Sequence, residues 1–283
     1  MLPRSISISS AQVAVPVKKI TEQTITDTTD WLSVEEPLEI QLTVGPAAER
    51  QTKSISVTMR TPGADADLAL GFLFTEGILR SIDEVQEVVQ PSCNVIQIQL
   101  QHHVTPRLSS AERNFYTTSS CGVCGKSSID AIRTVSPFAT HPRKPIELSA
   151  AQLMALPELL QQAQEAFALT GGIHASGLFS LQNELILLRE DVGRHNALDK
   201  LIGAALQQQQ LPLQDTILLL SGRASFELLQ KATMAGIPLV VSIGAPSSLA
   251  VALAMETDTS LIGFLKSNRL NIYHASKHLL LTH

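Results

Sequence analysis

Two of the three cysteines in this 283-residue chain, Cys121 and Cys124, lie three positions apart, and a glycine follows each. Glycine has no Cβ, so the backbone can turn tightly here and leave both sulfurs accessible. Lys126 and the free N–H groups of such a turn would stabilise a thiolate, the reactive form of cysteine. The pattern indicates a presented thiol pair, which suits half of a zinc site, a redox pair or a sulfur carrier.

A zinc site is poorly supported by the remaining ligands. Structural zinc needs four, commonly two Cys-x-x-Cys pairs or one pair with two histidines, and only Cys93 and distant histidines are available. A zinc deaminase would need His-x-Glu beside Pro-Cys-x-x-Cys. No His-x-Glu occurs, and Ser120 stands where the proline would be. We expect no metal site, and we expect Cys93 to pack at the start of a strand.

A second group of candidate residues follows the apolar segments of the second half of the chain. Arg194 and His195 open a predicted helix, and Arg223 follows a predicted strand at Thr216 to Leu220. His174 precedes a predicted strand, and Arg269 follows the last one. In open α/β sheets, ligands bind beyond the carboxyl ends of the strands, against helix N-termini. Arginines at such a place suit an anion, above all the phosphates of a nucleotide.

Each of these residues also has a structural interpretation. Asp191 can cap its helix with Arg194 as its ion-pair partner. His174 and His195 can be hydrogen-bonded core histidines, and Arg223 can form a surface salt bridge. Their joint occurrence at successive strand ends favours a binding site for the set.

Composition restricts the class of protein. The chain is 44% hydrophobic and 17% charged, as a folded protein is. A net charge of −5 and a pI near 5.9 argue against a general nucleic-acid-binding surface. Three cysteines do not make a disulfide framework, which favours a reducing compartment. We expect no signal peptide, because the first 20 residues have no compact apolar core followed by a small-residue cleavage site. We expect no membrane span, because the most apolar stretch (237–255) is interrupted by Pro238, Gly244 and Pro246. We therefore expect a cytoplasmic location.

The first half of the chain, residues 1–136, is predicted to be a strand-rich α+β part that ends with the Cys121 turn. Residues 1–30 are predicted to be a loose arm or an edge strand. Alternating apolar residues predict half-buried strands, and an amphipathic pattern predicts one helix. The strands are expected at 38–44, 54–59, 94–101 and 113–118, and the helix at 65–78.

The second half, residues 146–283, follows a proline-rich stretch at 137–145 that we interpret as a linker. Short apolar strands alternate here with helices, which predicts a three-layer α/β domain with a mostly parallel sheet. Helices are expected at 148–169 (interrupted or restarted at Pro157), 193–208, 224–235 and 247–256. Strands are expected as a pair within 178–189 and at 216–220, 239–243 and 260–265.

Taken together, these segments resemble the formate dehydrogenase accessory sulfurtransferase family, FdhD. The resemblance covers about residues 30–275. It is carried by Ala69-Leu70-Gly71-Phe72, Thr75-Glu76-Gly77-Ile78, Pro91-Ser92-Cys93-Asn94, Cys121-Gly122-Val123-Cys124-Gly125, Thr170-Gly171-Gly172 with His174, Glu190-Asp191-Val192-Gly193-Arg194-His195-Asn196-Ala197-Leu198-Asp199-Lys200, Arg223-Ala224-Ser225 with Glu227, and Gly263-Phe264.

The resemblance implies a cytoplasmic sulfur carrier, commonly a homodimer, with a cytidine-deaminase-like α/β domain that lacks the deaminase zinc. Such a protein accepts sulfur from a cysteine desulfurase as a cysteine persulfide. It passes the sulfur to the molybdenum cofactor, Mo-bis(molybdopterin guanine dinucleotide), before that cofactor enters the catalytic subunit of formate dehydrogenase. Cys121 would hold the persulfide, and Cys124 would assist or share the role.

The resemblance also places a cofactor-binding segment. It falls on Phe264, Leu265, Lys266, Ser267, Asn268 and Arg269. Ser267-Asn268 departs from the Pro-Gly or Gly-Gly that is usual there, and Ser120 replaces a frequent glycine. Arg194, His195, Arg223, Lys266 and Arg269 would together form a basic pocket for phosphates and guanine.

Two other functions fit the same residues. A cofactor-binding chaperone would hold the cofactor or the apo-dehydrogenase without moving sulfur. A zinc-stabilised scaffold would use the cysteines as ligands. The first would activate its client without Cys121, and the second would carry stoichiometric metal.

Overall fold

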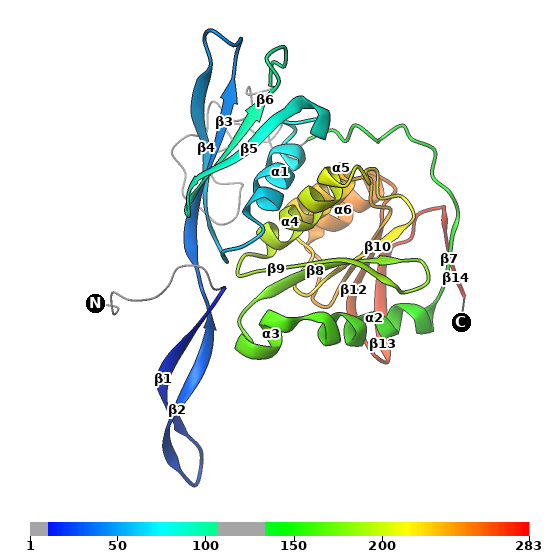
Figure 1. Cartoon of the computed structure of the whole chain (residues 1–283). Coiled ribbons are helices and arrows are strands. Elements are labelled where there is room, and N and C mark those ends of the chain that lie inside the picture. The colour runs from blue at the N-terminus through cyan, green and yellow to red at the C-terminus, as the bar shows by residue number, and fades with distance from the viewer. Residues whose placement is uncertain (1–10, 107–133, 283) are drawn as a thin grey trace.

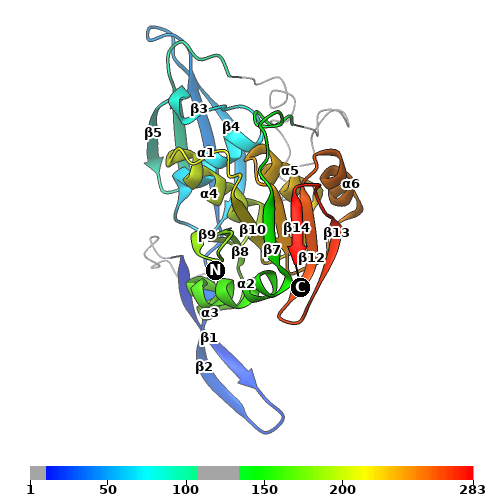
Figure 2. The ribbon, with the colours of Figure 1, turned by 90° about the vertical axis from the view of Figure 1, so that its right-hand side faces the viewer.

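The structure, a computed structural model, describes residues 11–106 and 134–282 of the chain. Its first two strands, β1 (Gln12–Ile20) and β2 (Ile25–Ser33), pair with each other as an antiparallel ribbon. Figures 1 and 2 show this ribbon projecting away from the rest of the molecule. The expectation of a loose arm or a single edge strand is therefore wrong for these residues, because they form two paired strands.

The next four strands form a sheet in the order β4-β3-β6-β5, in which β3 and β6 run parallel. Leu38, Ile40 and Leu42 alternate along β3 and are buried beneath the sheet with α1 (Asp65–Thr75). The strands are β3 (Glu36–Val44), β4 (Gln51–Arg60), β5 (Val85–Ser92) and β6 (Val95–Leu100). The predicted strands at 38–44, 54–59 and 94–101 are confirmed, and the helix ends earlier than predicted, before Gly77 with its φ of +73°.

A six-stranded sheet in the order β13-β12-β11-β10-β8-β9 forms the centre of the second half. Only β10–β11 and β11–β12 are parallel neighbours, yet β9 to β12 all point the same way, since two antiparallel steps join β9 to β10. The prediction of a mostly parallel sheet is therefore right in that four of the six strands point the same way. It is wrong for the hydrogen-bonded pairs, most of which are antiparallel. The strands are β8 (His174–Ser180), β9 (Leu185–Asp191), β10 (Thr216–Leu220), β11 (Leu239–Ser242), β12 (Ser260–Lys266) and β13 (Arg269–His274).

Helices cover both faces of this sheet, which confirms the three-layer prediction (Figure 1). Along β10, Leu218 and Leu220 join one core cluster, and Ile217 and Leu219 join the other. This alternation is what a strand buried on both sides requires. The first face packs against α4 (Arg194–Gln207), α5 (Phe226–Met234) and α6 (Ser248–Glu256), and the second packs against α2 (Ala150–Ala163).

The helix predicted over 148–169 is broken, but not at Pro157. Helix α2 continues through Pro157 to Ala163, and α3 (Glu165–Thr170) begins after Gln164. A proline inside a helix costs about 3 kcal/mol, and the buried side chains of Leu153, Leu156 and Leu160 hold α2 on the sheet despite it. Two short parallel strands that we did not predict, β7 (Ile146–Ser149) and β14 (Leu279–Thr282), flank this layer.

Helices α1 and α4 approach each other until their backbones touch. A Cβ built on Gly71 would lie 1.9 Å from the carbonyl oxygen of Asp199, and one built on Gly203 would lie 1.8 Å from that of Asp67. No side chain fits in either place, so two glycines permit the contact. The core of the four-stranded sheet and the core beneath α4, α5 and α6 are consequently one continuous cluster. No helix within residues 11–106 or 134–282 is long and apolar enough to cross a bilayer.

Candidate binding site at the strand ends

One edge of the six-stranded sheet collects most of the residues singled out in the second half. Strands β9 to β12 end at this edge, and β8 begins there, because His174 pairs with Asp191 in the ladder. Helix α4 is the next element after β9, α5 is the next after β10, and α6 is the next after β11. The predicted convergence of strand ends and helix N-termini is therefore present in the fold.

Two glycines keep the loops at this edge close together. A Cβ on Gly222 would lie 3.4 Å from the His174 ring and 4.0 Å from Cδ of Arg194. A Cβ on Gly244 would lie 3.0 Å from Cγ of Arg223. Glycines here place His174, Arg194 and Arg223 around the same short stretch of backbone.

His174 and Arg194 influence each other electrostatically. Burial lowers the pKa of His174 below its ordinary value of 6.5, and the positive charges of Arg194 and His195 lower it further, while Asp191 opposes them. The buried Nε of Arg194 has no hydrogen-bond partner among the described residues. An anion bound here would satisfy that nitrogen and offset the repulsion of positive charge at His174.

We expect replacement of Arg194 to change the titration of His174. In the unmodified chain, NMR titration of the His174 ring should give a pKa below 6.5. The His174 ring takes up a proton near pH 6.5 in the unfolded chain and only at lower pH in the folded chain. The contribution of the neutral ring to folding stability is therefore lost as the pH falls from 6.5 through the folded-state pKa. Arg194→Gln should raise the His174 pKa, and the exposed Lys266→Gln should leave it unchanged. Equal pKa values in all three proteins would contradict this electrostatic coupling.

His195 is held by two groups from the start of α5. Its Nε2 lies 2.9 Å from Oε2 of Glu227 and 3.3 Å from Oγ of Ser225, which also caps α5. The other oxygen of Glu227, Oε1, is buried and lacks a partner among the described residues. His195 is thus a positioned side chain at the strand ends, with an adjacent carboxylate that can accept one more donor.

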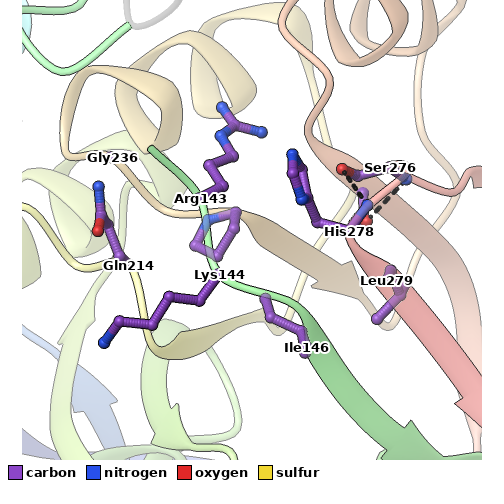
Figure 3. A pocket seen from close by; sticks show the side chains of 10 residues that line it. Arg143, Lys144, Ile146, Gln214, Gly236, Ser276, His278 and Leu279 are labelled. Atoms are coloured by element: carbon purple, nitrogen blue, oxygen red, sulfur yellow. Dashed lines mark hydrogen bonds between the residues drawn. The ribbon is translucent and has the colours of Figure 1, made fainter. Parts of the chain in front are cut away.

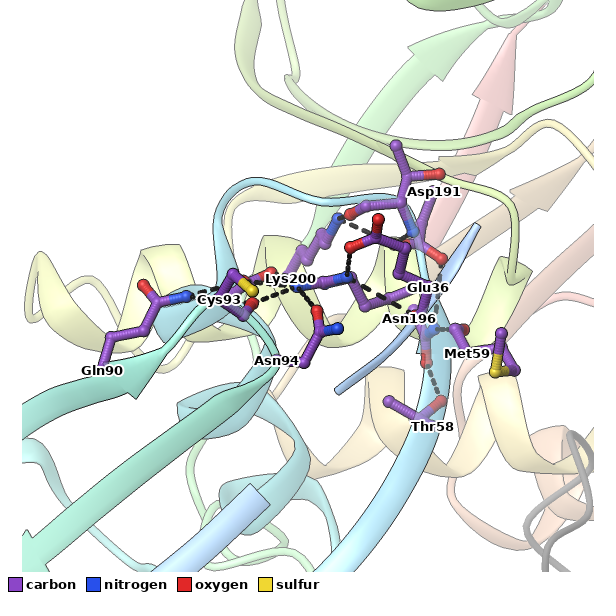
Figure 4. A network of polar contacts seen from close by, with 12 residues as sticks. Glu36, Thr58, Met59, Gln90, Cys93, Asn94, Asp191, Asn196 and Lys200 are labelled. Carbon is purple, nitrogen blue, oxygen red and sulfur yellow. Dashed lines mark hydrogen bonds and ion pairs between the residues drawn. The ribbon is translucent and has the colours of Figure 1, made fainter. Parts of the chain in front are cut away.

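Asp191 has a structural role instead of a ligand-binding one (Figure 4). Its carboxylate is fully buried, lies 2.7 Å from Nζ of Lys200 and accepts hydrogen bonds from the N–H groups of Thr61 and Gly193. Asn196 donates to the same carboxylate and to the carbonyl of Met59. Helix α4 has no side-chain cap hydrogen bond, so Asp191 does not cap it, and the only main-chain N–H that it binds there is that of the N-cap residue Gly193. The ion-pair partner of Asp191 is Lys200 and not Arg194, and the network joins the strand end of β9 to β4.

Two other acidic residues of the same motif are also structural. Glu190 accepts hydrogen bonds from the N–H groups of Ala166 and Phe167 at the start of α3. Asp199 is buried 2.9 Å from Nζ of Lys231 and accepts a hydrogen bond from Thr75. The sequence pattern around residues 190–200 therefore combines a few site residues with several that join the two halves of the molecule.

The segment at 264–269 forms the end of the β12–β13 hairpin. Phe264 has a φ of +52°, is 38% exposed, and donates its N–H to the carbonyl of Gly244, so the base of the hairpin adjoins the Arg223 loop. Lys266 pairs with Arg269 in the ladder, and both are exposed with Ser267 and Asn268 between them. Leu265 is buried in the core against α2, so its side chain is not available to a ligand.

The structure describes Cys93 and does not describe the other two cysteines. Cys121 and Cys124, and the strand predicted at 113–118, lie outside the described residues. Cys93 is exposed in the turn between β5 and β6, and its carbonyl accepts a hydrogen bond from Arg60 at 2.8 Å. The prediction that Cys93 packs at a strand start is therefore wrong, because its main chain, and not its side chain, holds the turn. Among the described residues, no three His, Cys, Asp or Glu side chains gather as metal ligands would.

The opposite edge of the sheet has hollows that contain none of the predicted site residues. Figure 3 shows one of about 10 Å³ between Arg143, Lys144 and His278, which has room for roughly one water molecule. A larger one of about 780 Å³ lies beside it, lined by Phe138, Leu253 and others. Its volume suits a small molecule, and Arg143 and Lys277 also line it. The residues that the sequence singled out lie at the strand ends, so we place the candidate site there.

Comparison with known proteins adds to this geometry. The sequence pattern described as the FdhD/NarQ family matches residues 33–280. The chain belongs to this family. It is 50% identical over 253 residues to the sulfur carrier protein FdhD of Mycolicibacterium paratuberculosis, covering 86% of this chain and 90% of that one. The sulfur carrier protein FdhD of Streptomyces avermitilis is 46% identical, with 93% of each chain covered.

A solved structure has the same fold. The crystal structure of a putative formate dehydrogenase accessory protein from Desulfotalea psychrophila superposes with a TM-score of 0.71 at 20% sequence identity, covering 96% of this FdhD/NarQ family chain and all of that one. The family predicted from the sequence motifs is thus confirmed, and the α/β fold class with it.

Proposed function

We propose that this chain is a sulfur carrier that serves formate dehydrogenase. The observation that carries the proposal is its 44–50% identity, over most of both chains, to relatives that bear the name sulfur carrier protein FdhD. In the finer proposal, a cysteine desulfurase supplies the sulfur, and the molybdenum cofactor, Mo-bis(molybdopterin guanine dinucleotide), is the substrate that receives it before insertion into the catalytic subunit of formate dehydrogenase.

The first chemical step requires an accessible thiolate, and Cys121 is our candidate. The Cys121 thiolate attacks the outer sulfur of the desulfurase persulfide, a new S–S bond forms, and the desulfurase cysteine leaves as a thiolate. Electrons balance without an external oxidant. The glycines after Cys121 and Cys124, together with Lys126, favour an exposed thiolate of this kind, and Cys124 assists or shares the role.

The acceptor site at the strand ends is proposed from the described residues. Arg194 and Arg223 provide positive charge, the starts of α4, α5 and α6 provide N–H groups, and Phe264 offers an exposed apolar ring beside Gly244. Phosphates bind at helix N-termini with arginines. His195, Lys266, Ser267, Asn268 and Arg269 complete the proposed surface, and Leu265 supports it from the core.

Sulfur loading tests the carrier proposal directly. The purified chain is incubated with a cysteine desulfurase and cysteine, and its intact mass is measured before and after treatment with a reductant. A gain of one sulfur atom that the reductant removes is the expected result. No gain, in a chain that still activates formate dehydrogenase, would move the assignment to a cofactor-binding chaperone.

A charge reversal tests the acceptor site separately. Arg223→Glu should weaken the binding of guanosine diphosphate, a probe for the guanine dinucleotide part of the substrate, by on the order of 100-fold, because it replaces a charge-assisted hydrogen bond by repulsion. Isothermal titration measures the affinity, and Arg80→Glu, at an exposed position outside the site, is the control. Sulfur loading of Arg223→Glu should be normal. Unchanged affinity would exclude Arg223 from the site.

A further inference from the structure

The larger cavity at the opposite edge of the six-stranded sheet has a volume of about 780 Å³. It lies between the stretch 134–143, which leads into β7, and the carboxyl-terminal ends of α5 and α6. A cavity of this size accommodates an organic molecule and not only water. None of the described residues that line it belongs to the strand-end site, so a molecule bound here would occupy a second site.

Two polar side chains in this cavity lack partners. Gln230 lies on α5, lines the cavity and is only 6% exposed. No hydrogen bond joins its amide to any other residue that the structure describes, although its main-chain carbonyl accepts one from Thr233. The hydroxyl of Thr134 lines the same cavity and is also buried without a partner in the described part of the chain. Buried polar groups are normally hydrogen-bonded, so both groups favour a bound molecule with donors and acceptors of its own.

Basic side chains form one wall of the cavity. Arg143, Lys277 and His278 line it, and Figure 3 shows Arg143 and His278 on neighbouring segments with their side chains turned the same way. One N–H of the Arg143 guanidinium donates to the main-chain carbonyl of Asp258. Its other donors have no partner within residues 11–106 and 134–282, so they are available to an anion.

The two acidic residues at the cavity are placed differently. The carboxylate of Asp258 accepts the N–H of Lys277 at 3.4 Å and lies 3.6 Å from Nε2 of His274. Burial raises the pKa of Asp258, but hydrogen bonds and the positive charge of Arg143 lower it below its ordinary value. Glu256 is exposed, so water and salt screen its charge. An anion in the cavity would therefore meet the basic side chains, while Asp258 stays bound to its own chain.

The cavity also has an apolar side. Phe138 and Leu253 line it, the first from the stretch before β7 and the second from α6. The Phe138 ring is fixed between two other rings, with its centroid 6.4 Å from that of Phe74 and 5.4 Å from that of His141. A fixed aromatic ring is a favourable surface for another flat ring.

We propose that this cavity binds a nucleoside phosphate with adenine as its base. Arg143 and Lys277 would hold the phosphate through charge-assisted hydrogen bonds, and the base would lie against Phe138. The Gln230 amide would read the edge of the base, because a primary amide can accept from the adenine amino group and donate to the neighbouring ring nitrogen. An inorganic anion would leave Gln230 without a partner, and so would an apolar acid.

Isothermal titration with ADP tests this site. One ADP per chain should bind, with the same affinity in the absence and in the presence of saturating guanosine diphosphate, the probe for the strand-end site. Adenosine and inorganic phosphate should each bind on the order of 10-fold or more weakly, because each keeps only part of the contacts. The titration does not depend on sulfur loading, so it stands whether or not the chain proves to be a sulfur carrier.

Two variants of the cavity wall locate the bound ADP. Gln230→Leu should weaken ADP binding by on the order of 10-fold, because it removes the hydrogen bonds to the base. Ala139→Glu, which adds a negative charge at an exposed position of the wall, should weaken it at least as much. Gln161→Leu and Ala252→Glu, the same substitutions at exposed positions outside the cavity, are the matched controls. Far-UV circular dichroism and an unchanged affinity for guanosine diphosphate establish that each variant is folded.

Three results would overturn the proposal. The first is that ADP does not bind at millimolar concentration. The second is that guanosine diphosphate or Arg223→Glu abolishes ADP binding while Gln230→Leu leaves it unchanged, which would place ADP at the strand ends. The third is that inorganic phosphate binds as tightly as ADP, which would make the cavity a general anion site.

Discussion

Cys121→Ala is expected to abolish sulfur loading. In the proposal, Cys121 is the nucleophile that accepts the sulfane sulfur and holds it as a persulfide, and Cys124 assists or shares the role. Activation of formate dehydrogenase should fall by on the order of 100-fold or more, as removal of a nucleophile commonly does. Intact-mass measurement after incubation with a cysteine desulfurase reports the first quantity, and formate oxidation by the matured client reports the second.

The other two cysteines give this experiment its controls. Cys124→Ala should load sulfur but transfer it less well, because Cys124 assists or shares the role of Cys121. Cys93→Ala should behave as the unmodified chain does, since the exposed Cys93 contributes its carbonyl and not its thiol to the fold. If sulfur loading survives in Cys121→Ala and disappears in Cys93→Ala, our scheme places the persulfide on the wrong cysteine.

Lys200→Met is expected to destabilise the fold by about 3–5 kcal/mol, the usual cost of removing one partner of a buried ion pair. The reason is that Asp191 is fully buried 2.7 Å from Nζ of Lys200, which also donates to the carbonyl of Thr61. The substitution leaves a carboxylate in the interior without a cation. Urea unfolding followed by circular dichroism measures the loss.

A surface pair of the same two residue types is the control. Lys144 lies 2.9 Å from Asp215, but their side chains are 71% and 55% exposed. Lys144→Met should therefore cost about 1 kcal/mol or less. Adding Asp191→Asn to Lys200→Met should recover part of the loss, because it removes the uncompensated charge. A cost for Lys200→Met no greater than that for Lys144→Met would show that the buried pair is not a source of stability.

Elements with a continuous or alternating apolar pattern were predicted well from the sequence. Thr216–Leu220 was predicted to the residue, because five apolar or β-branched residues between polar turns leave little ambiguity. The short strands β7 and β14 were missed, since four residues carry too little periodicity. Pro157 was overweighted as a breaker because the packing of α2 on the sheet cannot be read locally.

The site was predictable in its location and less so in its details. Strand direction brings His174, Arg194 and Arg223 to one edge, and this follows from the alternation of strands and helices. The partner of Asp191 did not follow, because Lys200 reaches it from the next turns of α4 and Thr61 comes from the other half of the chain. Leu265 lies in the predicted cofactor-binding segment but is buried, whereas its neighbours Phe264 and Lys266 are exposed.

The contact of Gly71 with α4 has a consequence for how the chain matures on the ribosome. The β3–β6 sheet and α1 precede residue 101, but α4, which covers α1, ends at Gln207. During synthesis at about 5–20 residues per second, the buried face of α1 waits on the order of ten seconds or more for its partner. The amino-terminal segment therefore does not complete its core by itself, and we expect α1 to gain its cover only after translation has passed Gln207.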